Sequence, residues 1–106
     1  MDKITFDFKN RTAIVTGGAQ GFGFDIAKRF LKSGAKVIIW DNDPKAIESA
    51  VKKINNSNLS SNVVDVSNYE EVEKNVKEIV KNSNIDILIN NAGITGPTAT
   101  LWEYDI

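Results

Sequence analysis

Short apolar runs alternate with segments of helical periodicity along most of the 106-residue chain, and this alternation limits the fold more than any other feature. Four such runs predict buried strands, at residues 12–16, 36–41, 62–66 and 85–89. The segments between them repeat apolar residues every three or four positions and predict helices, at residues 22–32, 44–54 and 67–81. Because strands joined by helices of this length form parallel sheets covered on both faces, we expect an α/β fold.

Right-handed crossovers then restrict the order of the strands in the sheet. The expected order is 3-2-1-4, the mononucleotide-binding half of a doubly wound parallel sheet with one strand added. The tail from Thr98 is expected to begin another helix, with Trp102 and Tyr104 packed against the sheet. In that arrangement the edge of the fourth strand stays open, and an open apolar edge favours self-association or pairing with another chain.

Local signals indicate where two of the helices begin. Asp43 followed by Pro44 is typical of a helix start, since Asp caps the first N–H groups and Pro suits the first helical position. Ser67 and Glu70 have the spacing of a capping box, which predicts that Ser67 caps the third helix.

Composition excludes several classes of chemistry. The chain has no cysteine and no histidine, which rules out disulfides, a thiolate nucleophile, a His-dependent triad and Cys or His metal sites. A net charge of −1 argues against nucleic acid or an acidic membrane surface as partner. No apolar run approaches the length of a membrane span, and the N-terminus lacks a signal-peptide core, so a cytoplasmic location is expected.

Three glycines, Gly17, Gly21 and Gly23, follow the first predicted strand within seven residues. They lie in the first βα turn, beside the point where strand order reverses and where such sheets bind ligands. Gly17 permits a tight exit from the strand, Gly21 lets the backbone approach a pyrophosphate, and Gly23 lets the helix pack closely. The helix N-terminus then offers free N–H groups to the phosphates. A glycine-rich turn without a ligand is the alternative interpretation of these residues alone.

Asp41 ends the second predicted strand, 18 residues after Gly23, near the spacing at which an acidic residue meets the adenosine ribose. A carboxylate there accepts hydrogen bonds from ribose hydroxyls and repels a 2′-phosphate, and position 42 holds Asn rather than Arg or Lys. NAD is therefore favoured over NADP. The alternative role, a cap for the next helix, is filled better by Asp43.

Taken together, these features resemble the short-chain dehydrogenase/reductase family. Residues 16–23 match its TGxxxGxG turn, Asp41 its NAD-selecting acid, Asp65-Val66 the aspartate after the third strand, and residues 90–93 its NNAG motif. The resemblance covers essentially the whole chain and implies a Rossmann-type NAD(P)-binding domain. Among the branches of the family, the sequence looks most like 3-oxoacyl-carrier-protein reductases and related sugar or alcohol dehydrogenases.

The resemblance also implies roles for single residues. Asp65 would contact adenine, with helix capping shared with Ser67 as an equal alternative, and Asn90 would hold the fourth strand and the adenosine ribose. Residues 90–93 taken alone would suit a simple turn. The expected cofactor-binding residues are Gly17, Gln20, Gly21, Phe22, Gly23, Asp41, Asp65, Val66, Asn90, Ala92 and Gly93.

The family's chemistry needs a serine and a Tyr-x-x-x-Lys pair, and neither tyrosine of this chain fits. Tyr69 is followed four residues later by Glu73, and Tyr104 has no residue at that offset. We therefore expect residues 1–106 to form one partial domain, a truncated doubly wound sheet that binds the cofactor of an NAD-dependent oxidoreductase but carries no catalytic residues. Two alternatives stay open: a module that binds NAD or an adenine nucleotide without turnover, and an interaction fragment complemented by another chain.

Overall fold

The structure is a computed structural model that describes residues 9–91 and the strand at 100–102. Its single sheet has the strand order β3-β2-β1-β4-β5, in which the first four strands are parallel and β5 is antiparallel to β4. The strands are β1 (Thr12–Thr16), β2 (Lys36–Asp41), β3 (Leu59–Val63), β4 (Ile87–Asn90) and β5 (Thr100–Trp102). The predicted α/β class and the order 3-2-1-4 are confirmed.

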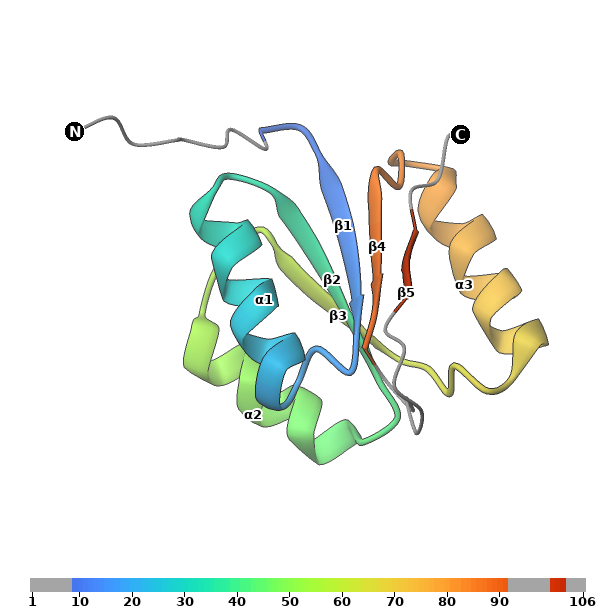
Figure 1. The fold of residues 1–106 in the computed structure, drawn as a ribbon, viewed down its shortest axis with the longest axis horizontal. Coiled ribbons are helices and arrows are strands. Elements are labelled where there is room, and N and C mark those ends of the chain that lie inside the picture. The colour runs from blue at the N-terminus through green and yellow to red at the C-terminus, as the bar shows by residue number, and fades with distance from the viewer. Residues whose placement is uncertain (1–8, 92–99, 103–106) are drawn as a thin grey trace.

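Helices cover both faces of this sheet. They are α1 (Gly21–Lys32), α2 (Pro44–Ile54) and α3 (Tyr69–Val80). Figure 1 shows α1 and α2 side by side over one face and α3 over the other. No helix in the part of the chain described here has the length and apolar character that a membrane span requires.

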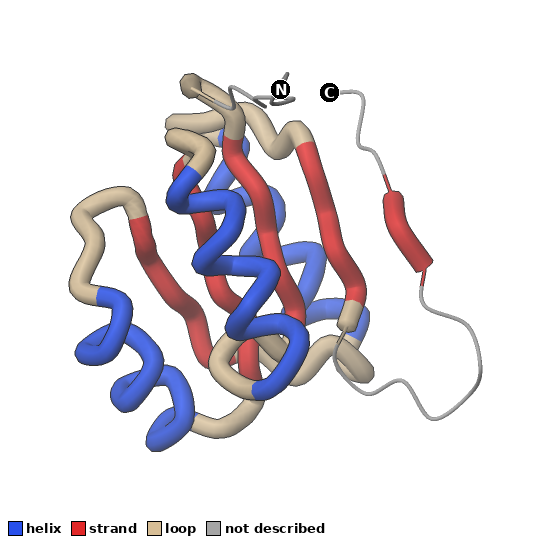
Figure 2. The backbone as a smooth tube through the Cα atoms, turned by 60° about the vertical axis from the view of Figure 1, so that its left-hand side comes forward, coloured by secondary structure: helices blue, strands red, loops and turns tan. Residues whose placement is uncertain are grey.

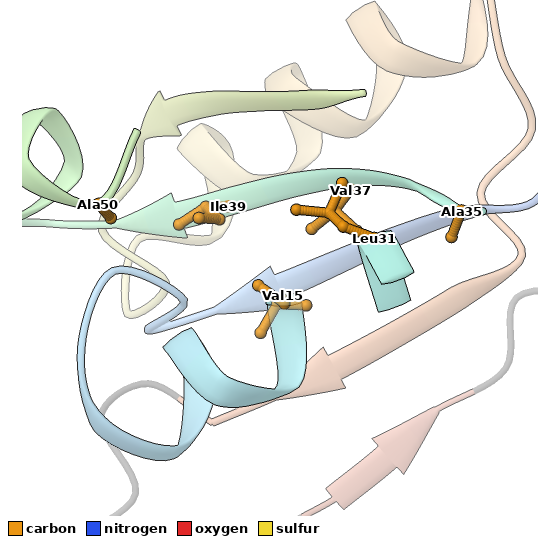
Figure 3. Packing of buried hydrophobic residues seen from close by; sticks show 7 residues of the cluster. Val15, Leu31, Ala35, Val37, Ile39 and Ala50 are labelled. Atoms are coloured by element: carbon orange, nitrogen blue, oxygen red, sulfur yellow. The ribbon is translucent and has the colours of Figure 1, made fainter. Parts of the chain in front are cut away.

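The core consists of two apolar layers, one on each face of the sheet. Side chains alternate between the faces along a strand, so Val15 and Ile39 point to one layer while their neighbours Ile14 and Trp40 point to the other. The first layer lies beneath α1 and α2 (Figure 3) and comprises Val15, Ala27, Leu31, Ala35, Val37, Ile39 and Ala50. The second lies beneath α3 and comprises Ile14, Trp40, Val64, Ile85 and Leu88. All five residues of β1 are buried, as expected of a central parallel strand covered on both faces.

The two predicted helix starts have different outcomes. Asp43 caps α2 as expected, with its carboxylate accepting from the N–H groups of Lys45 and Ala46. The prediction for α3 is wrong by one residue, because Asn68 is the cap and accepts from the N–H of Glu71. Ser67 instead donates both its N–H and its hydroxyl to Asp65, so it belongs to the turn that precedes the helix.

The third strand was expected at residues 62–66, and this prediction is wrong by three residues at each end. β3 pairs with β2 from Leu59 to Val63, and the chain then leaves the sheet toward α3. The reason is that β3 is an edge strand with the sequence LSSNV, whose polar side chains are mostly exposed or half-buried. An edge strand needs no continuous apolar run, and the apolar signal of residues 63–66 came partly from the loop.

The end of the described chain also differs from expectation. Residues 100–102 form β5 rather than the start of a helix, so Trp102 lies in a strand, while Tyr104 falls outside the described residues. β5 pairs with Leu88, Ile89 and Asn90 of β4, as Figure 2 shows at the edge of the sheet. The predicted open edge of the fourth strand, and the self-association inferred from it, therefore lose their structural basis over these three residues.

Two buried residues of the second layer, Ile14 and Trp40, should differ in how much their truncation destabilises the fold. Ile14 and Trp40 are each 1% exposed, and within residues 9–91 the indole N–H of Trp40 has no hydrogen-bond partner. Ile14→Ala should lower the free energy of unfolding by about 3 kcal/mol, because it leaves a cavity in the central strand. Trp40→Phe should cost at most about 1 kcal/mol, because it also removes a donor whose unpaired burial is itself unfavourable. Urea denaturation of both variants tests this, and a larger loss for Trp40→Phe would contradict it.

Candidate cofactor-binding site

A hollow of about 670 Å³ lies at the carboxyl ends of the parallel strands. This is the edge at which doubly wound sheets bind ligands, next to the reversal of strand order between β1 and β4. Four segments line it: the turn from β1 to α1, the end of β2, the segment after β3 and the end of β4. Their lining residues are Gly17, Gln20, Gly21, Phe22, Asp41, Asn42, Val64, Asp65, Val66, Ser67 and Asn91.

The turn from β1 to α1 requires its glycines for more than one reason. Gly17 and Gly21 have φ values of 63° and 54°, in the left-handed region that side chains with a β-carbon disfavour. Gly23 is buried, and a β-carbon there would collide with the carbonyl group of Gly17. The start of α1 therefore packs directly on the turn. At Gly21 the positive φ by itself favours glycine. The space beside this residue is open, and the close approach of a ligand there stays a prediction.

Gly18 is a further structural glycine that the sequence reasoning missed. A β-carbon at this position would lie 2.9 Å from Cγ2 of Ile39 and 2.9 Å from the carbonyl oxygen of Val15. Gly18 thus lets the turn lie flat against β2, where the N–H of Gly17 donates to the carbonyl of Trp40 at 2.7 Å. The doubled glycine after Thr16 was the available signal.

The N-terminus of α1 differs from those of the other two helices. Its N-cap residue, Gln20, makes no side-chain capping bond, and the first turn contains no acidic residue. In contrast, α2 is capped by Asp43, and α3 is capped by Asn68 with Glu70 and Glu71 in its first turn. The first N–H groups of a helix need partners and carry a partial positive charge. At α1 neither the cap nor the first turn supplies a carboxylate to these N–H groups, and they lie beside the hollow, which suits an anion.

Asp41 lies at the end of β2 with only 5% of its surface exposed. Its Oδ1 accepts from the N–H of Asp43 at 3.0 Å, and its backbone carbonyl accepts from the N–H of Val64 at 3.0 Å. No ion pair found among the described residues involves this carboxylate. A nearly buried acid that faces a hollow suits hydroxyl donors and disfavours a second negative charge, because screening by water is weak there.

Asp65 lies across the hollow on the segment after β3, and it is exposed. Its Oδ1 accepts from the hydroxyl of Ser67 at 2.6 Å and from the N–H of Ser67 at 2.9 Å. The Ser67 hydroxyl, followed by the Ser67 N–H, lowers the pKa of the Asp65 carboxyl below its usual value. The structure thus contains the turn-capping contacts of Asp65, while its predicted contact with adenine stays a prediction. Val66 is half-buried beside it.

One hydroxyl connects the glycine turn to the end of β4. The Thr16 hydroxyl lies 3.1 Å from Oδ1 of Asn90 and 3.3 Å from the carbonyl of Ile89, and it accepts from the N–H of Asn91 at 2.7 Å. Thr16 is 3% exposed while Asn90 and Asn91 are half-buried, so water has little access to these bonds. Neither Thr16 nor Asn91 was predicted as a cofactor-binding residue, although Thr16 begins the TGxxxGxG match and Asn91 lies in the NNAG match.

The structure brings most of the predicted residues together. Seven of them line the hollow: Gly17, Gln20, Gly21, Phe22, Asp41, Asp65 and Val66. Phe22 is 81% exposed at its rim, Gly23 is buried in α1, and Asn90 ends β4 next to the lining residue Asn91. Ala92 and Gly93 fall outside the described residues. Across residues 9–91 no group of three acidic side chains is placed to hold a metal ion.

Comparison with known proteins adds independent information. The family model of the short chain dehydrogenases matches residues 11–105. The chain is 42% identical over 90 residues to the 3-oxoacyl-(acyl-carrier-protein) reductase FabG of Chlamydia trachomatis, covering 81% of this chain and 36% of that protein. It is 35% identical over 100 residues to the 2-dehydro-3-deoxy-L-rhamnonate dehydrogenase (NAD(+)) of a Sphingomonas species, covering 93% of this chain and 39% of that protein.

A solved structure gives the same result for the fold. The RhlG/NADP active-site complex of Pseudomonas aeruginosa superimposes with a TM-score of 0.75 at 30% sequence identity, covering 85% of this chain and 37% of that one. The chain thus spans between a third and two fifths of the length of these relatives. With a family model matched over nearly all of its residues, the chain belongs to the short-chain dehydrogenase family.

Proposed function

We propose that the hollow binds the adenosine diphosphate half of NAD, and that this chain is the cofactor-binding part of an oxidoreductase acting on an alcohol or ketone. One observation carries the proposal. The uncapped N-terminus of α1 and the nearly buried carboxylate of Asp41 open into the same hollow. The first suits a pyrophosphate and the second a ribose with free hydroxyls, which are the two neighbouring groups of an NAD molecule.

The pyrophosphate is assigned to the β1–α1 turn. Gly17 and Gly21 give the turn its left-handed angles, and Gln20, Gly21 and Phe22 bring the first backbone N–H groups of α1 to the hollow. These N–H groups and the positive end of the helix dipole would bind the phosphate oxygens. Gly23 contributes indirectly, since it lets α1 start this close to the turn.

The adenosine is assigned to the far side of the same hollow. Asp41 would accept hydrogen bonds from the ribose hydroxyls, and Asp65 with Val66 would border the adenine ring. A 2′-phosphate would bring two negative charges to a carboxylate that is only 5% exposed, which is the basis for preferring NAD over NADP. Asn90, Ala92 and Gly93 are proposed to complete the site beside β4.

Hydride transfer would take place beyond the residues described here. When bound, the nicotinamide ring supplies the hydride or accepts it, and this chain's residues hold the other half of the cofactor. The sequence contains no Tyr-x-x-x-Lys pair, so we assign residues 1–106 a binding role and no catalytic one. The relatives are named for different substrates and dinucleotides, so the substrate is assigned only as an alcohol or ketone.

Removal of the Asp41 carboxylate tests the choice of cofactor. Asp41→Ala should weaken NAD binding by about tenfold or more, because hydrogen bonds to a charged group are lost, and should leave NADP binding equal or improved. Calorimetric titration with both dinucleotides measures the ratio. Asp25→Ala is the matched control, since it removes an exposed carboxylate of α1 that does not line the hollow. An unchanged ratio in Asp41→Ala would reject the ribose assignment.

A side chain at Gly21 should block the phosphate site. Gly21→Val is expected to lower NAD affinity by at least about tenfold, because it strains a turn whose φ is 54° and places methyl groups beside the hollow. Gly34→Val is the control, because Gly34 also has a positive φ, of 93°, but follows α1 away from the hollow. Thermal unfolding should show similar losses for both variants, and equal NAD affinities would refute the phosphate assignment.

The Thr16 hydroxyl should matter for both stability and binding. Thr16→Val keeps the side-chain shape but removes the hydroxyl that bonds to Asn90 and Asn91. This change should lower the free energy of unfolding by about 1–3 kcal/mol and should also weaken NAD binding. Thr16→Ser keeps the hydroxyl and should retain most of both. Denaturant unfolding and NAD titration of the pair provide the measurement, and indistinguishable Val and Ser variants would contradict this role.

A further inference from the structure

Asp43 joins the cofactor-selecting carboxylate to the start of α2. Its backbone N–H donates to Oδ1 of Asp41 at 3.0 Å. Its own side chain accepts from the N–H groups of Lys45 at 3.0 Å and Ala46 at 3.3 Å. The same residue therefore caps the helix and holds one oxygen of Asp41.

The backbone of Asp43 is fixed from two directions. Its side-chain bonds tie it to the first turn of α2, with φ −107° and ψ 103° at the cap. Pro44 follows, and a residue before proline is restricted to extended angles of this kind. The direction of the Asp43 N–H is consequently set by the start of the helix rather than by solvent.

The Asp41 carboxylate has few other means of keeping its orientation. Its backbone is held by β2 and by the bond from Val64, but among the described residues the N–H of Asp43 is the one donor found on its side-chain oxygens. Rotation about the side-chain bonds would turn the carboxylate plane away from a ribose diol. When the Asp43 N–H holds Oδ1 in place, the directions of Oδ2 and of the remaining lone pair of Oδ1 are fixed as well.

We propose that Asp43 is a positioning residue for cofactor choice: the N-cap of α2 sets the orientation in which Asp41 accepts the ribose hydroxyls. This inference rests on the proposed function, because it requires Asp41 to be the ribose-binding group. Asp43 itself is exposed and does not line the hollow, so it acts through Asp41. The alternative is that the Asp43 charge repels a 2′-phosphate directly. The Asp43→Asn variant, which replaces the carboxylate with an amide, distinguishes the two explanations.

The test measures binding of ADP-ribose and of 2′-phospho-ADP-ribose to the 106-residue chain by calorimetry. Both probes lack nicotinamide and differ only in the 2′-phosphate of the adenosine ribose. Their affinity ratio therefore depends on that position alone. Asp43→Ala keeps the backbone N–H that donates to Asp41 but loses the capping bonds that fix its direction, so it should reduce the preference for ADP-ribose on the order of tenfold. Asp43→Asn keeps the cap without the charge and should hold the ratio within about threefold of wild type.

A control variant separates positioning from general loss of stability. Asn68→Ala removes the N-cap of α3, and its thermal destabilisation should match that of Asp43→Ala, since each loses one capping side chain. Its affinity ratio should equal that of wild type. Pro44→Ala keeps the cap but relaxes the restriction on Asp43, and it should shift the ratio in the same direction as Asp43→Ala by a smaller factor.

The outcomes distinguish this inference from the proposed function. If Asp41→Ala abolishes the preference and Asp43→Ala leaves it intact, the ribose assignment stands and the positioning role is overturned. If Asp43→Asn loses the preference as fully as Asp43→Ala, direct charge repulsion replaces positioning. If the wild-type chain binds neither probe, or Asp41→Ala leaves the ratio unchanged, the proposed function fails and this inference fails with it.

Discussion

The contact between the start of α1 and the turn that leaves β1 is the constraint on which the site depends. No β-carbon fits at Gly23 because the carbonyl group of Gly17 occupies that space. This contact places the first N–H groups of the helix close to the end of the central strand. Without it, the uncapped helix N-terminus and the Asp41 carboxylate would not face the same hollow.

Two hydrogen-bonded links extend this constraint across the sheet. On one side, the Thr16 hydroxyl joins the glycine turn to Asn90 and Asn91, so β1 and β4 present their ends as one surface. On the other side, the N–H of Gly17 joins the turn to the carbonyl of Trp40, directly before Asp41. The hollow is thus built from neighbouring strand ends that hydrogen bonds fix to one turn.

Sequence reasoning succeeded where a local signal coincided with the final environment. The bounds of β1 and β2 follow from apolar runs that are buried, and those of α2 from Asp43 and Pro44, which act within their own turn. It failed where pairing with another strand determines whether an element exists and where it ends. β3 is recognised by its bonds to β2 rather than by hydrophobicity, and β5 exists through pairing with β4. The Thr16 network joins groups 73 to 75 residues apart, a separation at which no local pattern carries information.

The strand order has a consequence for how the chain acquires its structure. β1 meets β2 after one short crossover, whereas its other neighbour, β4, lies more than 70 residues later in the sequence. Contacts so distant along the chain form late, because the intervening segment must first be closed into a loop. We therefore expect the half with α1 and α2 to assemble before β4 docks. During synthesis, the Thr16 hydroxyl can bond to Asn90 and Asn91 only after β4 has been made, so this edge of the sheet forms late.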